Sequence, residues 1–219
     1  MDVREVLKHL DHTELLQTAT HDDIVKLCDD ALHYGTASVC VPPSYVKLAS
    51  ARLAGRLPVC TVIGFPHGYN TTGCKIFEAK EALENGADEL DMVINIGWVK
   101  DGLYAQVEDE IRALKAVAGD HVLKVIIETG LLTDEEKIRM CEVITRAGAD
   151  YIKTCTGYAV GKAEPHDIAL FKQHIGPHVK IKASSGMTSI QQGADFVAMG
   201  CDRLGSRLFI RFARELGVE

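Results

Sequence analysis

Short runs of β-type residues alternate with longer amphipathic segments along the chain. We take LDHTEL (residues 10–15) as the first strand. The other runs read ASVCV, VCTVIGF, ELDMVIN, VLKVIIE, DYIKT, VKIKA and DRLG, at residues 37–41, 59–65, 89–95, 122–128, 150–154, 179–183 and 202–205. Short apolar runs rich in β-branched residues are typical of buried strands, so the pattern predicts eight of them.

The segments between these runs carry helix start and stop signals. A helix is predicted over residues 22–34, and another is predicted from the caps at Thr71 and Thr72 to Gly86. A third begins at Thr133, which stands three residues before a glutamate as in a capping box, and ends at Gly148.

Strands separated by helices, at a spacing of roughly 20 to 33 residues, imply βαβ units and a parallel sheet. Eight such units favour a single (β/α)8 barrel, a TIM barrel, as one domain over residues 1–219. The chain is shorter than the usual length of about 250 residues but lies within the range of this fold. An open doubly wound sheet is the alternative, although no Gly-x-Gly-x-x-Gly follows the first strand to indicate a dinucleotide site.

Composition and charge limit which partners and which cellular compartment the sequence predicts. The net charge of −7 and pI of about 5.7 argue against nucleic acid and anionic membranes as main partners. The charged N-terminus is unlike a signal peptide, and no apolar run approaches the roughly 20 residues of a membrane span. The seven cysteines are scattered and include no Cys-x-x-Cys, which is typical of reduced thiols in a cytoplasmic protein.

One regularity brings candidate residues together. Cys40, Asp91 and Lys153 each follow a helix-ending glycine by five residues. Equal offsets place the three at similar heights on their strands and with the same parity, so in a barrel they can point the same way. Because Gly-Ala-Asp is also a common connection between a helix and a strand, the repeat has a purely structural explanation as well.

Three lysines interrupt the apolar runs, namely Lys124, Lys153 and Lys182, and two carboxylates, Asp91 and Glu128, are expected inside strands with them. A structural ion pair or a snorkelling chain explains any single lysine of this kind. Several together, at the carboxyl ends of barrel strands, indicate chemistry.

A lysine nucleophile must be partly unprotonated, and both burial and a neighbouring cation lower a lysine pKa. Lys153 and Lys182 are expected on adjacent strands, where each ammonium would lower the pKa of the other. Such a lysine attacks a carbonyl to form a Schiff base, which accepts electrons when a C–C bond is made or broken. A carboxylate such as Asp91 then moves protons through a water molecule or a hydroxyl group.

Glycine-rich turns follow the sixth, seventh and eighth strands: TGYAVG, ASSGMT and LGSR. Barrels commonly bind phosphate on backbone N–H groups after the last two strands. Ser184, Ser185, Ser206 and Arg207 are candidates for further phosphate contacts, whereas ordinary turn chemistry is the alternative reading.

The motifs LDHT, GFPHG, FEAKEAL, GADELDMVINIG, KVIIETGLLTDEEK, DYIKTCTGY and IKASSGMTS resemble the deoxyribose-phosphate aldolase family of class I aldolases. The resemblance runs from Leu10 to about Gly205. It implies a (β/α)8 barrel that reversibly cleaves 2-deoxy-D-ribose 5-phosphate to D-glyceraldehyde 3-phosphate and acetaldehyde, with no metal and no cofactor.

The resemblance also assigns roles. Lys153 would be the Schiff-base lysine, Lys182 a second lysine that perturbs it, and Asp91 the carboxylate of the proton relay. Substrate-binding positions would be Cys40, Asp11, Thr13, Thr156, Gly157, Ser185, Gly186, Gly205, Ser206 and Arg207.

The phosphate loops depart from the family pattern. Ser185 replaces a glycine, Thr188 an arginine, and GKAE (residues 161–164) a glycine pair. We expect Ser185 to offer its N–H from an ordinary φ, and Arg207 or Lys162 to replace lost phosphate contacts. Weaker phosphate affinity with a different substrate preference is the alternative.

The sequence therefore predicts a cytoplasmic class I aldolase whose partners are a phosphorylated sugar and aldehydes. We expect neither nucleic acid nor membrane as a partner, and a homodimer is one possible assembly. Two rivals remain open: another lysine-dependent barrel lyase acting on different aldehydes, and a catalytically silent barrel used for binding.

Overall fold

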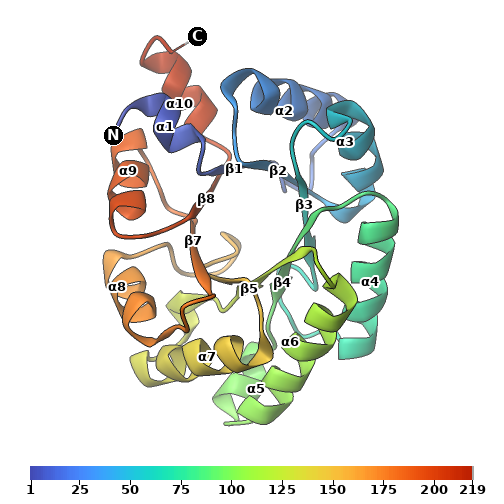
Figure 1. Ribbon diagram of the computed structural model, residues 1–219, viewed down its shortest axis with the longest axis vertical. Coiled ribbons are helices and arrows are strands. Elements are labelled where there is room, and N and C mark those ends of the chain that lie inside the picture. Colours follow the sequence, from blue (N-terminus) through green and yellow to red (C-terminus); the bar gives the residue numbers. More distant parts are fainter. Residues whose placement is uncertain (219) are drawn as a thin grey trace.

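A computed structural model describes residues 1–218. Its eight strands are all parallel and close into a barrel in chain order, because β1 pairs with β8 as well as with β2 (Figure 1). The closed barrel was predicted, and the open sheet is excluded. The strands are β1 Leu10–Thr13, β2 Ser38–Val41, β3 Val59–Ile63, β4 Glu89–Val93, β5 Val122–Ile126, β6 Tyr151–Lys153, β7 Lys180–Ser184 and β8 Arg203–Ser206.

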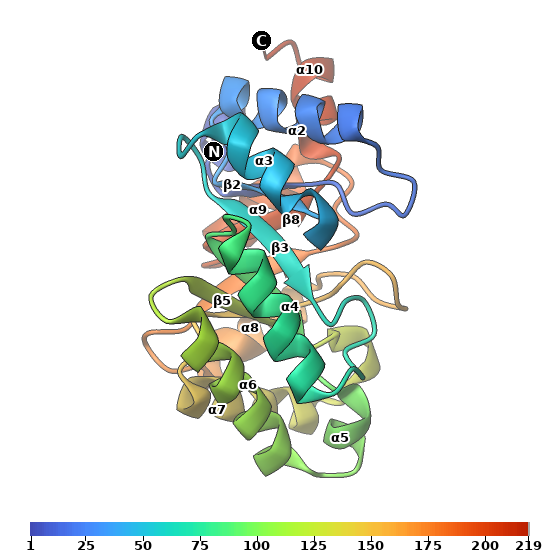
Figure 2. The same ribbon diagram turned by 90° about the vertical axis from the view of Figure 1, so that its right-hand side faces the viewer.

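Helices surround the ring of strands on its outside, and the two chain ends lie on one side of the molecule, near α1 and α10 (Figure 1). The side view shows α4 and α6 running alongside each other against the barrel wall (Figure 2). The helices are α1 Val3–Leu7, α2 His21–Tyr34, α3 Val46–Leu53, α4 Thr72–Glu84, α5 Ile96–Lys100, α6 Tyr104–Ala118, α7 Asp134–Ala147, α8 Pro165–His174, α9 Ile190–Ala198 and α10 Phe209–Glu215, with 3-10 turns η1 Pro43–Tyr45 and η2 Thr129–Leu131.

The predicted caps set the helix limits. The Thr133 hydroxyl accepts a hydrogen bond from the backbone N–H of Glu136, and the Glu136 carboxylate accepts one from the backbone N–H of Thr133, which completes the capping box of α7. Gly148 ends α7 in the left-handed region, at φ 77°. Thr71 caps α4, as predicted. These local signals fix where the helices begin and end.

Five of the strands, β1, β3, β4, β5 and β6, end earlier than the runs that predicted them. The run over residues 122–128 is strand only to Ile126, and Glu128 lies beyond it with a positive φ of 53°. The prediction that Glu128 lies inside a strand was therefore wrong. Apolar composition does not mark the end of a strand whose following turn is also buried.

Alternate residues of each strand face two different environments. One set packs against the helices and forms the main hydrophobic core, for example Leu90 and Met92 of β4. The other set points into the barrel and includes Asp91 and Lys124, which are fully buried. The barrel interior is therefore unusually polar, and this interior holds the candidate site. No helix among residues 1–218 has the length and apolar character needed to cross a membrane.

Candidate active site

Asp91 lies at the centre of three lysines inside the barrel. Its Oδ2 accepts hydrogen bonds from Nζ of Lys153 and of Lys182, both at 2.7 Å, and its Oδ1 accepts one from Lys124 at 2.8 Å. These side chains come from four consecutive strands, β4 to β7, and the register places Lys153 directly opposite Lys182. The predicted trio of Asp91, Lys153 and Lys182 is therefore brought together, and the two lysines lie on adjacent strands as expected.

A second layer of charge lies beneath this trio. Asp11 pairs with Lys182 and with Arg203, and Glu89 pairs with Lys124 at 2.6 Å and with Arg203 at 2.8 Å. The interior thus holds three carboxylates and four cations within one connected network. Buried charges are tolerated when they are paired in this way.

The electrostatics of the network correct one expectation. Burial lowers the pKa of Lys182, but Asp11 and Asp91 outweigh that effect and hold it above its ordinary value. Burial raises the pKa of the Asp91 carboxyl, yet the three surrounding ammonium groups hold it well below its ordinary value. A lowered pKa was expected for Lys182 because only the nearby ammonium of Lys153 was weighed, and the opposing charges of Asp11 and Asp91 were not. Asp91 separates the two lysines and stabilises the charged form of Lys182.

Only one of the three lysines borders open space in the part of the chain that the structure describes. Lys153 is 4% exposed and lines a cavity of about 370 Å³, whereas Lys124 and Lys182 are both completely buried and do not line it. A carbonyl compound in this cavity meets the Nζ of Lys153 first. The geometry therefore distinguishes the candidate nucleophile from the other two lysines.

The cavity wall contains most of the predicted substrate-binding residues. These are Thr13, Thr156, Gly157, Ser185, Gly186, Gly205, Ser206 and Arg207. Asp11 and Cys40 do not line it, since Asp11 is a buried counter-ion of Lys182 and Cys40 is only 1% exposed. Lys162 does not line it either, because its side chain packs over Gly186 and pairs with Glu164 at 3.4 Å.

Apolar residues and a tyrosine complete the wall and were not predicted. Leu15, Leu16, Met187 and Leu208 line the cavity. The Tyr158 hydroxyl donates to the carbonyl oxygen of Leu15, and its ring stands edge-on to Phe65 at 5.4 Å between centroids. Tyr158 thereby ties the loop after β6 to the loop after β1. The position of Tyr158 after TCTG was the only hint in the sequence.

Glu128 holds the loop after β6 through hydrogen bonds to Thr156. Its Oε2 accepts hydrogen bonds from the backbone N–H of Thr156, at 3.1 Å, and from the Thr156 hydroxyl. The backbone N–H of Tyr158 donates in turn to that hydroxyl, at 3.1 Å. The buried Glu128 therefore holds the turn that carries Thr156 and Gly157 into the cavity wall.

Ser185 has an unexpected backbone conformation. Its φ is +80°, in the region that favours glycine, whereas an ordinary φ was expected. Its carbonyl accepts from the N–H of Ala163 at 3.2 Å, which joins the turn after β7 to the loop after β6. The turn keeps the conformation that a glycine adopts easily, and the serine side chain is accommodated at a cost of about 1–2 kcal/mol.

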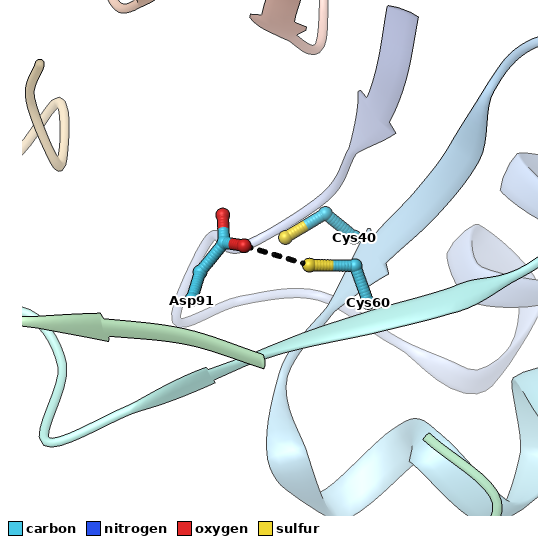
Figure 3. A group of neighbouring side chains, drawn as sticks. All are labelled: Cys40, Cys60 and Asp91. Carbon is cyan, nitrogen blue, oxygen red and sulfur yellow. Dashed lines mark hydrogen bonds between the residues drawn. The ribbon is translucent and has the colours of Figure 1, made fainter. Parts of the chain in front are cut away.

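Cys40 and Cys60 lie beside Asp91 on the other side of the barrel interior (Figure 3). The Cys60 thiol donates to Asp91 Oδ1 at 3.1 Å, and Lys124 donates to Cys60 Sγ at 3.2 Å. Cys40 thus joins Asp91 and Lys153 inside the barrel, as the equal glycine offsets predicted. Cys60 was not singled out, although its alternation with Val62 would have placed it inside.

A closed (β/α)8 barrel with a lysine exposed to a cavity, and a carboxylate bridging it to a second lysine, has the arrangement expected of a Schiff-base aldolase. Comparisons with known proteins agree. The family model described as "DeoC/LacD family aldolase" matches residues 5–202. A deoxyribose-phosphate aldolase of Clostridium botulinum is 54% identical over 206 residues, which cover 94% of this chain and 93% of the relative.

Solved structures show the same likeness. The structure "QR15, an Aldolase" superposes with a TM-score of 0.92 at 36% identity, covering 97% of this chain and 96% of that one. A deoxyribose phosphate aldolase of Aeropyrum pernix, described as tetrameric, gives a TM-score of 0.88 at 28% identity over 99% of this chain and 92% of its own. The chain belongs to the DeoC/LacD family of aldolases.

Proposed function

We propose that this aldolase cleaves 2-deoxy-D-ribose 5-phosphate to D-glyceraldehyde 3-phosphate and acetaldehyde, with Lys153 as the Schiff-base lysine. The reaction is supported by the family and by a relative of that name at 54% identity over nearly the whole chain. The residue assignment rests on one observation: Lys153 alone among the three clustered lysines lines the cavity, and Asp91 joins its Nζ to Lys182.

The geometry supports a sequence of steps. The unprotonated Nζ of Lys153 attacks the aldehyde carbon C1 of the open-chain sugar, and loss of water leaves an iminium ion. A base removes the proton from the C3 hydroxyl, the C2–C3 bond breaks, and its electron pair moves into the iminium to form an enamine. The three-carbon aldehyde leaves. Protonation of the enamine and hydrolysis then release acetaldehyde and restore Lys153.

Asp91 and Lys182 are suited to the proton transfers in this sequence. The lysines around Asp91 hold its pKa low, which makes it a weak base, so its proposed role is to pass protons on through a bridging water molecule or substrate hydroxyl. Lys182 is the charged donor at the same carboxylate oxygen. Each transfer therefore moves a proton along a connected chain of groups rather than creating an unpaired buried charge.

Arg207 is the group proposed to bind the phosphate. It lines the cavity and is exposed, and no carboxylate pairs with it among residues 1–218. Gly157, Gly186 and Gly205, whose N–H groups are the candidate phosphate donors, line the same wall. A charge-assisted hydrogen bond from Arg207 to phosphate contributes about 1.5–3 kcal/mol, which offsets the arginine missing at Thr188.

Two variants test the proposal. Lys153→Arg keeps the charge but cannot form an imine, so we expect cleavage of the phosphorylated sugar to stop while the circular dichroism spectrum stays unchanged. Arg207→Ala should raise KM for 2-deoxy-D-ribose 5-phosphate by about 10- to 150-fold and barely change turnover of unphosphorylated deoxyribose. Equal losses on both sugars would exclude Arg207 as the phosphate ligand. A wild type that prefers the unphosphorylated sugar would contradict the phosphate assignment and leave the aldolase assignment standing.

Assembly and compartment remain predictions. The Aeropyrum pernix relative is described as tetrameric, whereas a homodimer is the assembly considered for this chain from its sequence. A cytoplasmic location likewise rests on composition and on the reduced thiols expected from it. Light scattering at two protein concentrations tests the assembly, and a monomer or tetramer would contradict the dimer.

A further inference from the structure

Cys40 and Cys60 form a pair of thiols opposite each other inside the barrel. The register of β2 and β3 makes their Cα atoms direct partners, and both side chains point inward toward Asp91 (Figure 3). The two Sγ atoms and a carboxylate oxygen of Asp91 all lie within 4.8 Å of one another. Proton transfer in the proposed reaction does not require two thiols here.

The backbone spacing suits a bond between the two sulfur atoms. Neighbouring strands lie about 4.8 Å apart. A disulfide joins Cα atoms that are about 4.4–6.8 Å apart, so the strands need not separate for it to form. Side-chain rotations would bring the sulfur atoms into bonding distance. The rigid strands prevent full relaxation around such a bond, and strained disulfides are the ones that thiols reduce most easily.

The charges around the pair favour a thiolate over a metal ion. Cys60, Asp91 and Cys40 offer possible metal ligands, but Lys124 and Lys182 already hold the carboxylate, and a cation would have to displace them. The neighbouring Cys60 thiol and the Lys182 ammonium outweigh burial and lower the pKa of Cys40. Burial, with the nearby Asp91 carboxylate, raises the pKa of Cys60 well above its ordinary value. Cys40 is therefore the more nucleophilic thiol, and Cys60 is its protonated neighbour.

The thiol pair lies next to the cavity that a small oxidant can enter. Thr13, the direct strand partner of Cys40, lines the same cavity as Lys153. Any aldehyde that reaches Lys153 is larger than hydrogen peroxide, so peroxide can enter the same cavity. Cys40 lies just behind this wall, at 1% exposure.

We propose that Cys40 and Cys60 are a reversible oxidation site, at which a hydroperoxide converts the two thiols into a disulfide that switches the aldolase off. The Cys40 thiolate attacks one peroxide oxygen, the O–O bond breaks, and protonation of the leaving hydroxide gives water and a sulfenic acid. Cys60 then attacks the sulfenic sulfur, the S–O bond breaks, and a second water leaves. Two thiols are oxidised by two electrons, and one hydrogen peroxide is reduced to two waters.

Disulfide formation disrupts the site through Asp91. The Cys60 thiol gives up its proton and so can no longer donate to Asp91 Oδ1, and its sulfur turns away from Lys124 toward Cys40. Asp91 is the shared acceptor of Lys153 and Lys182, so its displacement alters the proposed proton relay. This loss of activity rests on the proposed function, whereas formation of the disulfide does not.

The test treats the reduced full-length protein with hydrogen peroxide and follows thiols and activity on the same samples. We expect a mass loss of about 2 Da, a Cys40–Cys60 cross-linked peptide on a non-reducing map, and a fall in kcat of tenfold or more in proportion to that peptide. Dithiothreitol should restore both mass and activity. Activity lost with both thiols still free would overturn the proposal, and so would a Cys40–Cys60 disulfide that leaves activity unchanged.

Two variants sharpen the result. Cys60→Ser keeps a donor beside Asp91 but has no second sulfur, so peroxide should add oxygen to Cys40 and dithiothreitol should not reverse the further oxidised forms. Cys74→Ser removes an exposed thiol outside the barrel and should behave as wild type throughout. If the Cys60 variant fails to fold, the wild-type peptide map still decides the matter. A protein with no aldolase activity would refute the proposed function, while the map would still report whether the disulfide forms.

Discussion

Replacing Asp91 by asparagine should remove the central charge of the barrel while keeping its shape. The carboxylate accepts from three ammonium groups at 2.7, 2.7 and 2.8 Å and is completely buried. With Asp11 and Glu89 left, two carboxylates would face four cations. Removing one partner of a buried ion pair costs about 3–5 kcal/mol because an uncompensated charge remains. With an m-value of about 3 kcal/mol/M, the urea midpoint should fall by about 1–2 M.

The same variant should show a characteristic pH dependence. Without Asp91, Lys124 and Lys182 keep only Glu89 and Asp11 as counter-ions, so we expect burial to hold their folded-state pKa values below the unfolded value of about 10.4. The unfolded state then binds more protons than the folded state, and stability must rise with pH in that window. The deficit of Asp91→Asn relative to wild type should therefore shrink between about pH 7 and pH 9.

Urea denaturation followed by circular dichroism at several pH values measures this effect. Asp120→Asn is the matched control, because Asp120 is exposed, and its midpoint should stay close to wild type. An Asp91→Asn protein that is as stable as wild type at neutral pH would refute the charge balance described here. A deficit that grows as pH rises would show that the lysines are not the groups left uncompensated.

Three further outcomes follow from the site. Lys182→Leu should reduce kcat and shift the pH–rate profile, since Lys153 and Lys182 share one oxygen of Asp91; an unchanged rate and profile would make Lys182 purely structural. Ser185→Gly should raise the free energy of unfolding by about 0.5–1 kcal/mol because it relieves a positive φ. Ser184→Gly, inside β7, should lower it by about the same amount, and a change of the same sign in both variants would contradict backbone strain at Ser185. Chelator treatment should leave activity intact, and a loss that zinc restores would overturn the Schiff-base mechanism.

The alternation of strand and helix patterns was enough to predict the barrel, because each βαβ unit is coded locally by caps and apolar runs. The approach of Lys153 to Asp91 was also predictable, since equal offsets from helix-ending glycines give the two residues similar heights and the same parity on strands of one barrel. Equal sequence offsets predict equivalent positions in the fold because the barrel repeats one strand geometry eight times.

The remaining features depend on contacts between distant segments. Nothing local indicated that Asp11 and Glu89 would neutralise Lys124 and Lys182, and that omission reversed the expected pKa shift of Lys182. The positive φ of Ser185 is imposed by its turn rather than by serine's own preference. The link from Tyr158 to Leu15 joins loops that are far apart in sequence. These properties arise only once the strands have closed.

The central claim is that Lys153 is the lysine that forms the imine. Incubating the protein with acetaldehyde and borohydride reduces any imine to a stable secondary amine, and a peptide mass map locates it. The proposed mechanism predicts a two-carbon adduct on Lys153, with Lys124 and Lys182 unmodified because they are buried away from the cavity. An adduct on Lys182 or Lys124, with Lys153 free, would contradict it.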